Sequence, residues 1–287
     1  MKTYDKNRKK TPRVIWWHIC CLGIMVLSIM LMKTPVKAAT SGVTTLQTNK
    51  TYQSYDLDGD GKKDSIQMRT SQSGYKMLAS VYVNGKKVYN MPNNHWWQSA
   101  GIKMITLGNG KNFVYAWMEG ESMSCDRILQ YKNKKMSTVV DINNLMKKYQ
   151  SKSYVSWYPS NGIKVSGNTM SVKVSSMNWT IAGASFIFQY KYKDGTLKRV
   201  SYSGVIENSG VYIVDKKFPV YKKAGSSLVS FTANYGQKVT ANKYYLKDGK
   251  MWIKLTNSAG KSGWIKALTT GGGKSRSPLF SNAFYAS

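Results

Sequence analysis

The chain has 287 residues and a formal net charge of +30, from 43 Lys and Arg against 13 Asp and Glu. The length allows an export segment and two modest domains, and the charge predicts attraction to polyanions. Of three cysteines, Cys20 and Cys21 lie in an apolar N-terminal run. Cys125 is the only thiol outside that run, so the rest of the chain cannot form an intrachain disulfide.

The N-terminus predicts export. A basic stretch that ends at Arg13 precedes the apolar run Val14 to Met32, and small residues follow at Ala38 and Ala39. Residues 1–39 are therefore interpreted as a secretory signal peptide. The run is also long enough to span a bilayer, so membrane attachment through residues 14–32, with the C-terminal domains outside, is the alternative. The expected location is extracellular or cell-wall associated.

The rest of the chain predicts an all-β protein. Residues 40–51 are polar and are expected to be a linker, and residues 52–208 alternate like short strands with almost no helical period. Asn84-Gly85, Asn109-Gly110 and Asp194-Gly195 are strong hairpin signals. One short helix is expected within residues 142–150, and residues 270–287, which include three glycines, are expected to be a flexible tail.

One stretch carries the clearest chemistry. Asp56, Asp58, Asp60 and Asp64 alternate within a loop of nine residues that also contains Gly59 and Gly61. Calcium prefers six to eight oxygen ligands, and glycines let the backbone turn sharply enough to gather the carboxylates. We expect a structural Ca²⁺ site; the alternative is a solvated Asp/Gly turn.

The same stretch resembles the calcium loop of FG-GAP/VCBS-type β-propeller repeats, which carry Asp-x-Asp-x-Asp-Gly-x-x-Asp between two strands. The resemblance covers about residues 52–70 and implies that the four aspartates are ligands. Position twelve is Gln67, and the following residues alternate like a strand, which disfavours an EF-hand.

A weak repeat supports sheets of similar construction. Tyr131-Lys132 precedes Met136, and Tyr192-Lys193 precedes Leu197, about sixty residues later, with a further relative around Asn84-Gly85. Both hairpins are interpreted as the last hairpin of a blade-like sheet. Three units are fewer than a closed propeller needs, so we expect an incomplete propeller or packed antiparallel sheets over residues 52–208.

The pattern of the sequence changes after residue 210. Phe218-Pro219-Val220-Tyr221, Gly236-Gln237-Lys238-Val239, Met251-Trp252-Ile253-Lys254-Leu255 and Gly260-Lys261-Ser262-Gly263-Trp264-Ile265 follow in order. These landmarks resemble a bacterial SH3-like (Src-homology-3-type) domain over residues 211–269. The resemblance implies a small β-barrel that binds the cell wall, and it implies that aromatic residues line a ligand groove. The implied groove residues are Tyr221, Tyr244, Tyr245, Trp252 and Trp264.

Catalytic alternatives are weaker. His95 and Cys125 form a conceivable nucleophilic pair, but no family motif surrounds either. Glu119 and Glu121 form a conceivable acid pair, but they lie two residues apart on an expected strand, and a surface pair or a loop contact is the simpler expectation. Trp96 and Trp97 can stack on sugar rings, although packing of at least one in the core is the simpler expectation. No catalytic residue is predicted, and the chain is interpreted as a non-enzyme.

These observations predict a secreted, non-catalytic, cell-envelope protein that resembles exoproteins of Gram-positive bacteria. Export disfavours nucleic acid and leaves peptidoglycan or teichoic acid as the expected partner of the SH3-like domain. A degenerate cell-wall hydrolase and a membrane-anchored interaction or sensor protein are the alternatives.

Overall fold

The computed structural model describes residues 40–92, 96–120, 124–145, 162–207, 209–269 and 275–284. Within these ranges the fold is all-β, as predicted: there are twenty strands, all antiparallel where they pair, and the only helix is the 3₁₀ turn η1 (Ile142–Asn144). No helix of this described part has the length and hydropathy to cross a membrane. The predicted signal or anchor segment, residues 1–39, lies outside the described residues.

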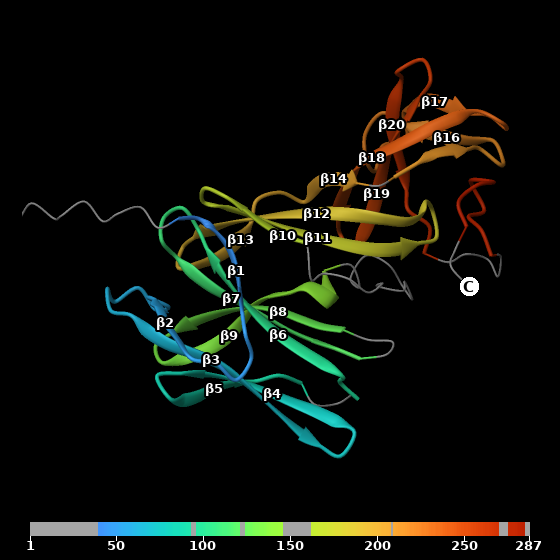
Figure 1. Cartoon of the computed structure of the whole chain (residues 1–287). Coiled ribbons are helices and arrows are strands. Elements are labelled where there is room, and N and C mark those ends of the chain that lie inside the picture. Colours follow the sequence, from blue (N-terminus) through green and yellow to red (C-terminus); the bar gives the residue numbers. More distant parts are fainter. Residues whose placement is uncertain are drawn as a thin grey trace, which may run out of the picture. The chain divides into compact units, whose positions relative to one another are not determined.

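Two sheets form the N-terminal half (Figure 1). The four-stranded sheet has its strands in chain order: β2 (Tyr52–Tyr55), β3 (Asp64–Ser73), β4 (Lys76–Val83) and β5 (Lys86–Asn90). The five-stranded sheet has the order β1 (Gly42–Leu46), β6 (Ser99–Thr106), β7 (Asn112–Glu119), β8 (Ser124–Lys132) and β9 (Lys135–Asp141). The expectation of a linker over residues 40–51 is wrong, because β1 pairs with β6 along five residues and buries Leu46.

The third sheet contains the remaining eleven strands of the described residues. Its main path is β10-β11-β12-β14-β18-β19-β20-β16-β17, with β13 paired to β12 and β15 paired to β18. The strands are β10 (Ile163–Ser166), β11 (Thr169–Asn178), β12 (Ala182–Lys193), β13 (Thr196–Arg199), β14 (Ser203–Glu207), β15 (Val211–Ile213), β16 (Phe218–Tyr221), β17 (Val229–Ala233), β18 (Lys238–Lys247), β19 (Lys250–Asn257) and β20 (Ser262–Lys266).

Three successive meanders of four strands, β2–β5, β6–β9 and β10–β13, each end in a tight two-residue hairpin. The turn residues are Asn84-Gly85, Asn133-Lys134 and Asp194-Gly195, and all six have positive φ, as type I′ turns require. The weak sequence repeat therefore marks the same hairpin of each meander. Asn, Asp and Gly adopt this backbone conformation at little cost.

The five-stranded sheet is buried on both faces. Met104, Val114 and Leu129 belong to a core shared with Ile66 and Val81 of the four-stranded sheet. On the opposite face, side chains of the same strands join a second core that includes residues of β11 and β12; these are Ile105, Phe113, Tyr115, Ile128 and Val140. Strands β7 and β8 contain runs of consecutive buried residues. Such runs are expected of a strand that is covered on both faces, because it has no solvent-facing side to carry polar residues.

The second core continues past residue 208, where the sequence predicts a domain boundary. Strand β14 pairs with β12 through Phe186↔Ile206 and with β18 through Gly204↔Tyr244. Tyr244 contacts Phe186 and Phe188, and its hydroxyl donates to the Ile187 carbonyl at 2.7 Å. The segments before and after residue 208 thus share one sheet and one core, and they are not separated by a linker.

The C-terminal segment is also more ordered than predicted. Phe280 is fully buried, bridges to Val214 and contacts Tyr212 and Phe218. The expectation of a flexible tail is therefore wrong for residues 275–284, while 270–274 and 285–287 lie outside the described residues. Strand β17 ends its sheet, and among the described strands no pairing joins it back to β18, so a closed barrel is not seen.

Candidate functional site

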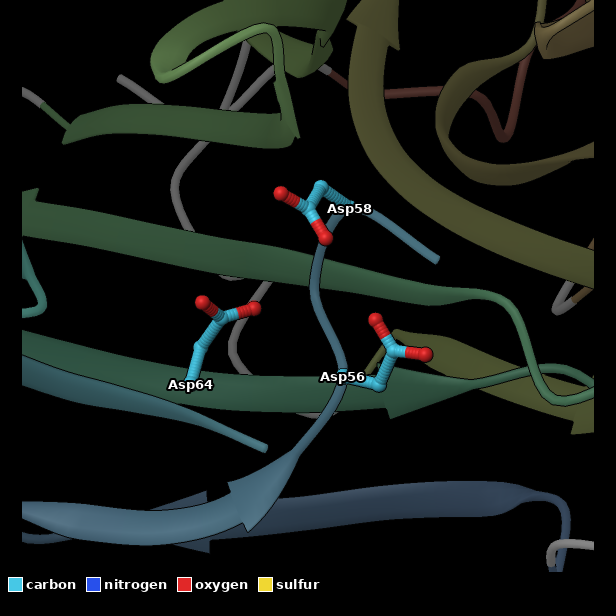
Figure 2. A group of neighbouring side chains, drawn as sticks. All are labelled: Asp56, Asp58 and Asp64. Atoms are coloured by element: carbon cyan, nitrogen blue, oxygen red, sulfur yellow. The ribbon is translucent and has the colours of Figure 1, made fainter. Parts of the chain in front are cut away.

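The acidic loop connects β2 to β3, as predicted for a loop between two strands. One carboxylate oxygen from each of Asp56, Asp58 and Asp64 lies within 4.8 Å of the other two (Figure 2). The fourth predicted ligand, Asp60, is exposed and is not part of this group; its Oδ1 accepts from the Lys62 amide at 2.8 Å. The structure thus gathers three of the four predicted side chains.

The two glycines of the loop direct amides toward Asp56. Gly59 and Gly61 have φ of +83° and +87°, values that favour glycine. Their N–H groups donate to Asp56 Oδ1 at 2.6 Å and Oδ2 at 2.9 Å, respectively. The loop conformation is therefore held by its own backbone, and the Asp56 carboxylate is presented in one orientation.

Asp64 is the buried member of this acidic group. It is 7% exposed, and its Oδ2 accepts from the amide of Leu57, which is itself buried in the core between the two N-terminal sheets. Its Oδ1 accepts from Asn84 Nδ2 at 2.7 Å. Burial of a carboxylate is expensive unless it is hydrogen-bonded, and these two donors meet that requirement.

Other turns position the loop. Asn112 Nδ2 donates to the Asp56 carbonyl at 2.8 Å, and the Lys111 ammonium lies 2.6 Å from the place a Cβ on Gly59 would take. The Tyr131 hydroxyl has its pKa raised by burial and, secondarily, by the charges of Asp64 and Asp58. In the sequence, the Asn84 and Asn109 turns are recognisable only as hairpins, because their contact with the loop depends on sheet packing.

This arrangement suits a hard cation. Five of the six oxygens of the three carboxylates accept one hydrogen bond each, and each keeps capacity for a second partner. Oxygen-only ligands favour Ca²⁺ or Mg²⁺ over softer metals. With one ligand oxygen from each carboxylate, the group supplies three of the six to eight oxygens that Ca²⁺ takes, so water or backbone oxygens must complete a site.

The predicted aromatic residues lie on a second surface. By strand register, Tyr245 of β18 is opposite Trp252 of β19, and Trp264 of β20 is opposite Tyr221 of β16. All four rings are half-buried and lie on the face away from the core. The prediction is wrong for Tyr244, which is 1% exposed and faces the opposite side because neighbouring residues of a strand alternate.

Lysines alternate with these rings. Lys266 is opposite Trp252, Lys254 is opposite Trp264, and Lys243 is opposite Lys254. The Tyr245 and Trp264 rings contact each other with centroids 6.3 Å apart. We name these seven residues the lysine–aromatic face: Tyr221, Lys243, Tyr245, Trp252, Lys254, Trp264 and Lys266.

The positive charge of this region is not neutralised within the described protein. Residues 211–269 contain eleven Lys and two Asp, and ten of the lysines are exposed. None of the eleven forms an ion pair with a residue that the structure describes, whereas Asp215 pairs with Arg276 at 3.4 Å. A sheet face that alternates rings with free ammonium groups can stack on flat ligand surfaces and attract anions.

The conceivable catalytic residues are not assembled. Cys125 is buried, and burial raises the pKa of its thiol to about 11, so it is protonated at neutral pH. His95 and Glu121 lie outside the described residues. Trp97 is buried as expected, with its Nε1 donating to the Pro92 carbonyl, while Trp96 is exposed.

A buried acid that sequence reasoning missed lies beside Cys125 on β8. Asp126 is 2% exposed; its Oδ1 accepts from the Tyr115 hydroxyl at 2.5 Å, and its Oδ2 has no hydrogen-bond partner among the described residues. Burial raises the pKa of Asp126, and the Tyr115 hydrogen bond opposes this. Only the packing of β7 against β8 brings these two residues together.

No family model matches the chain, and comparisons with curated proteins and with solved structures find no match.

Proposed function

We propose that this chain is an exported, non-catalytic, cell-envelope protein that binds an anionic wall polymer through the lysine–aromatic face. One observation carries the proposal: on adjacent strands, Trp252 is opposite Lys266 and Trp264 is opposite Lys254. Such alternation offers ring stacking to sugars and ammonium groups to phosphates along the same direction. Teichoic acid presents both features, and peptidoglycan, which carries carboxylates on its peptides, is the other ligand of the right charge.

The proposal also includes the two resemblances. We propose an SH3-like module over residues 211–269 on the sequence landmarks given above, and an incomplete propeller over residues 52–208, which the three meanders of four antiparallel strands support. Asp56, Asp58 and Asp64 are proposed to bind one structural Ca²⁺, which would cross-link the β2–β3 loop. The proposal of export is based on the sequence of residues 1–39, and membrane attachment through this segment is the alternative.

The test is cosedimentation of residues 40–287 with purified Gram-positive walls, with and without teichoic acid, across a salt series. The triple variant Lys243→Gln, Lys254→Gln and Lys266→Gln is compared with a control of equal charge change, Lys86→Gln, Lys135→Gln and Lys198→Gln. All three control lysines are exposed and lie outside the lysine–aromatic face.

We expect the face variant to lose most binding, the control to keep most of it, and binding to weaken as salt screens the charges. Binding that requires teichoic acid would identify the anionic polymer as the ligand. Salt-resistant binding to stripped walls would instead indicate peptidoglycan recognition by the aromatic rings. Equal losses in the two triple variants would overturn the assignment to this face, and absence of binding at low salt would overturn wall binding.

A further inference from the structure

A pair of exposed aromatic rings lies far in sequence from the lysine–aromatic face. Tyr75 and Trp96 are 85% and 68% exposed, and their rings stack with centroids 6.1 Å apart and an interplanar angle of 23°. Tyr75 is at the turn between β3 and β4, and Trp96 precedes β6. Isolated exposed aromatics are ordinary, but two large rings that contact each other and solvent form a small platform.

The platform has a rigid base. Trp97 is 2% exposed and its carbonyl accepts from the Met77 amide at 3.2 Å, which ties the Trp96 segment to the start of β4. The Gln98 amide donates to the Glu119 carbonyl at 2.8 Å. A Cβ on Gly120 would lie only 2.5 Å from the Trp96 carbonyl, so the glycine permits this close approach. These contacts fix the backbone next to both rings before any ligand arrives, which reduces the entropy lost on binding.

The residues beside Tyr75 narrow the class of ligand that the two rings can bind. Ser71, Gln72, Ser73 and Lys76 flank Tyr75, and all are exposed and polar. An interface for a protein partner or a bilayer would be expected to continue the apolar surface with aliphatic side chains. Flat rings among hydroxyl and amide groups instead match a pyranose, which has one apolar face of C–H groups and a rim of hydroxyls.

We propose that Tyr75 and Trp96 form a carbohydrate-stacking site that binds an uncharged pyranose ring of a glycan, independently of the lysine–aromatic face. Ring contact supplies the affinity, and the polar side chains of the β3–β4 turn are placed to meet the sugar hydroxyls. With its own site on the N-terminal half of the chain, the protein can engage a glycan at two points, and linked contacts raise overall avidity.

The experiment is isothermal titration calorimetry of residues 40–287 with hexasaccharides of β-1,4-linked N-acetylglucosamine and of β-1,4-linked glucose. Trp96→Ala and Tyr75→Ala are each compared with Tyr235→Ala, which removes a ring that is 78% exposed on another turn. We expect each platform variant to weaken binding about fivefold, while Tyr235→Ala and Tyr75→Phe retain it. The indole N–H resonance of Trp96, assigned from its absence in Trp96→Ala, should shift on addition of sugar.

Absence of binding to both hexasaccharides at millimolar concentration would overturn the proposal, as would unchanged affinity in Trp96→Ala. Binding to uncharged phosphatidylcholine vesicles that depends on Trp96, without sugar binding, would also overturn it in favour of a membrane contact. The triple glutamine variant of the lysine–aromatic face keeps every ring, so it should bind these uncharged probes as the wild type does. Sugar binding that depends on Trp96 and wall binding that depends on the three lysines are measured separately, so either proposal can fail without the other.

Discussion

At the scale of single residues, Asp58 and Asp60 are a matched pair for testing the acidic loop. Both are exposed, but only Asp58 belongs to the group whose carboxylate oxygens converge. A ligand at a hundredfold excess over its dissociation constant stabilises a protein by about 2.7 kcal/mol. If the loop binds Ca²⁺, calcium should therefore raise the melting temperature of the wild type.

We expect Asp58→Asn to remove most of that rise and Asp60→Asn to preserve it. A tenfold loss of affinity costs about 1.4 kcal/mol of the calcium-dependent stabilisation, and with chelator both variants should melt near the wild type because Asn keeps the local hydrogen-bond acceptor. Differential scanning fluorimetry with Ca²⁺, Mg²⁺ or chelator measures this. Equal melting of the wild type in all three conditions would rule out a site of useful affinity.

Asp126 provides a prediction for pH dependence. Its pKa is raised above the unfolded value, chiefly by burial, so the folded state holds the proton more tightly than the unfolded chain does. The free energy of unfolding contributed by this group is then largest below the unfolded pKa of about 3.9. It falls as the pH rises from there through the folded pKa.

Asp126→Asn has no proton to lose, so its melting temperature should fall less than that of the wild type as the pH rises through that window. The amide also keeps an oxygen that can accept from Tyr115. Asp248→Asn, at an exposed hairpin turn, is the control and should leave the pH profile unchanged. A profile for Asp126→Asn that parallels the wild type would show that Asp126 is ionised at little cost.

At the scale of elements, β14 is the strand that joins the two parts of the third sheet. Gly204 is the second residue of β14, and a Cβ there would approach the Ile187 carbonyl and the Tyr244 hydroxyl oxygen to 2.5 Å each. The Ile187 carbonyl is a backbone atom and cannot move aside as the end of a flexible side chain can. Overpacking of this kind lowers the stability of a protein by about 1–3 kcal/mol.

Gly204→Ala should therefore lower the free energy of unfolding by that amount, measured by urea denaturation, whereas Ser203→Ala on the exposed face should have a small effect. The Tyr244→Phe change should be partly additive with Gly204→Ala, because both disturb the hydrogen bond from Tyr244 to Ile187. A neutral Gly204→Ala substitution would show that β14 can shift without cost.

At the scale of the whole molecule, the continuity of the second core predicts how the protein unfolds. The core that contains Phe186 and Phe188 also contains Tyr244, Ile253 and Phe280. Segments that share a core are expected to unfold together, because unfolding of one segment exposes the core residues of the other.

We expect the segment 162–284 to unfold in a single calorimetric transition, and a fragment that begins at residue 211 to be much less stable than the same strands in the full chain. Hydrogen exchange of the β12 and β18 amides should show similar protection at their sites of slowest exchange. A separate transition for the C-terminal strands, with unchanged melting in the fragment, would contradict this and restore an independent domain.

The sequence by itself determined the all-β class, the acidic loop between two strands, the positions of the hairpins and the aromatic and lysine-rich character of residues 211–269. These are local properties: alternation defines strands, Asn-Gly and Asp-Gly define turns, and spaced aspartates define a loop that can hold a cation. The sequence-based expectation failed at β1, whose polar residues pair at a sheet edge, and at Phe280, whose burial depends on distant strands.

Only the tertiary structure decided which of these residues lie together. Strand register placed Lys254 opposite Trp264 and turned Tyr244 to the core, and loop packing placed Asp60 outside the acidic group. Pairings of strands depend on contacts between residues that are distant in the chain, and a shift of one residue reverses every side chain. The stacking of Tyr75 on Trp96 arises in the same way, because the β3–β4 turn and the segment before β6 meet only when the sheets pack.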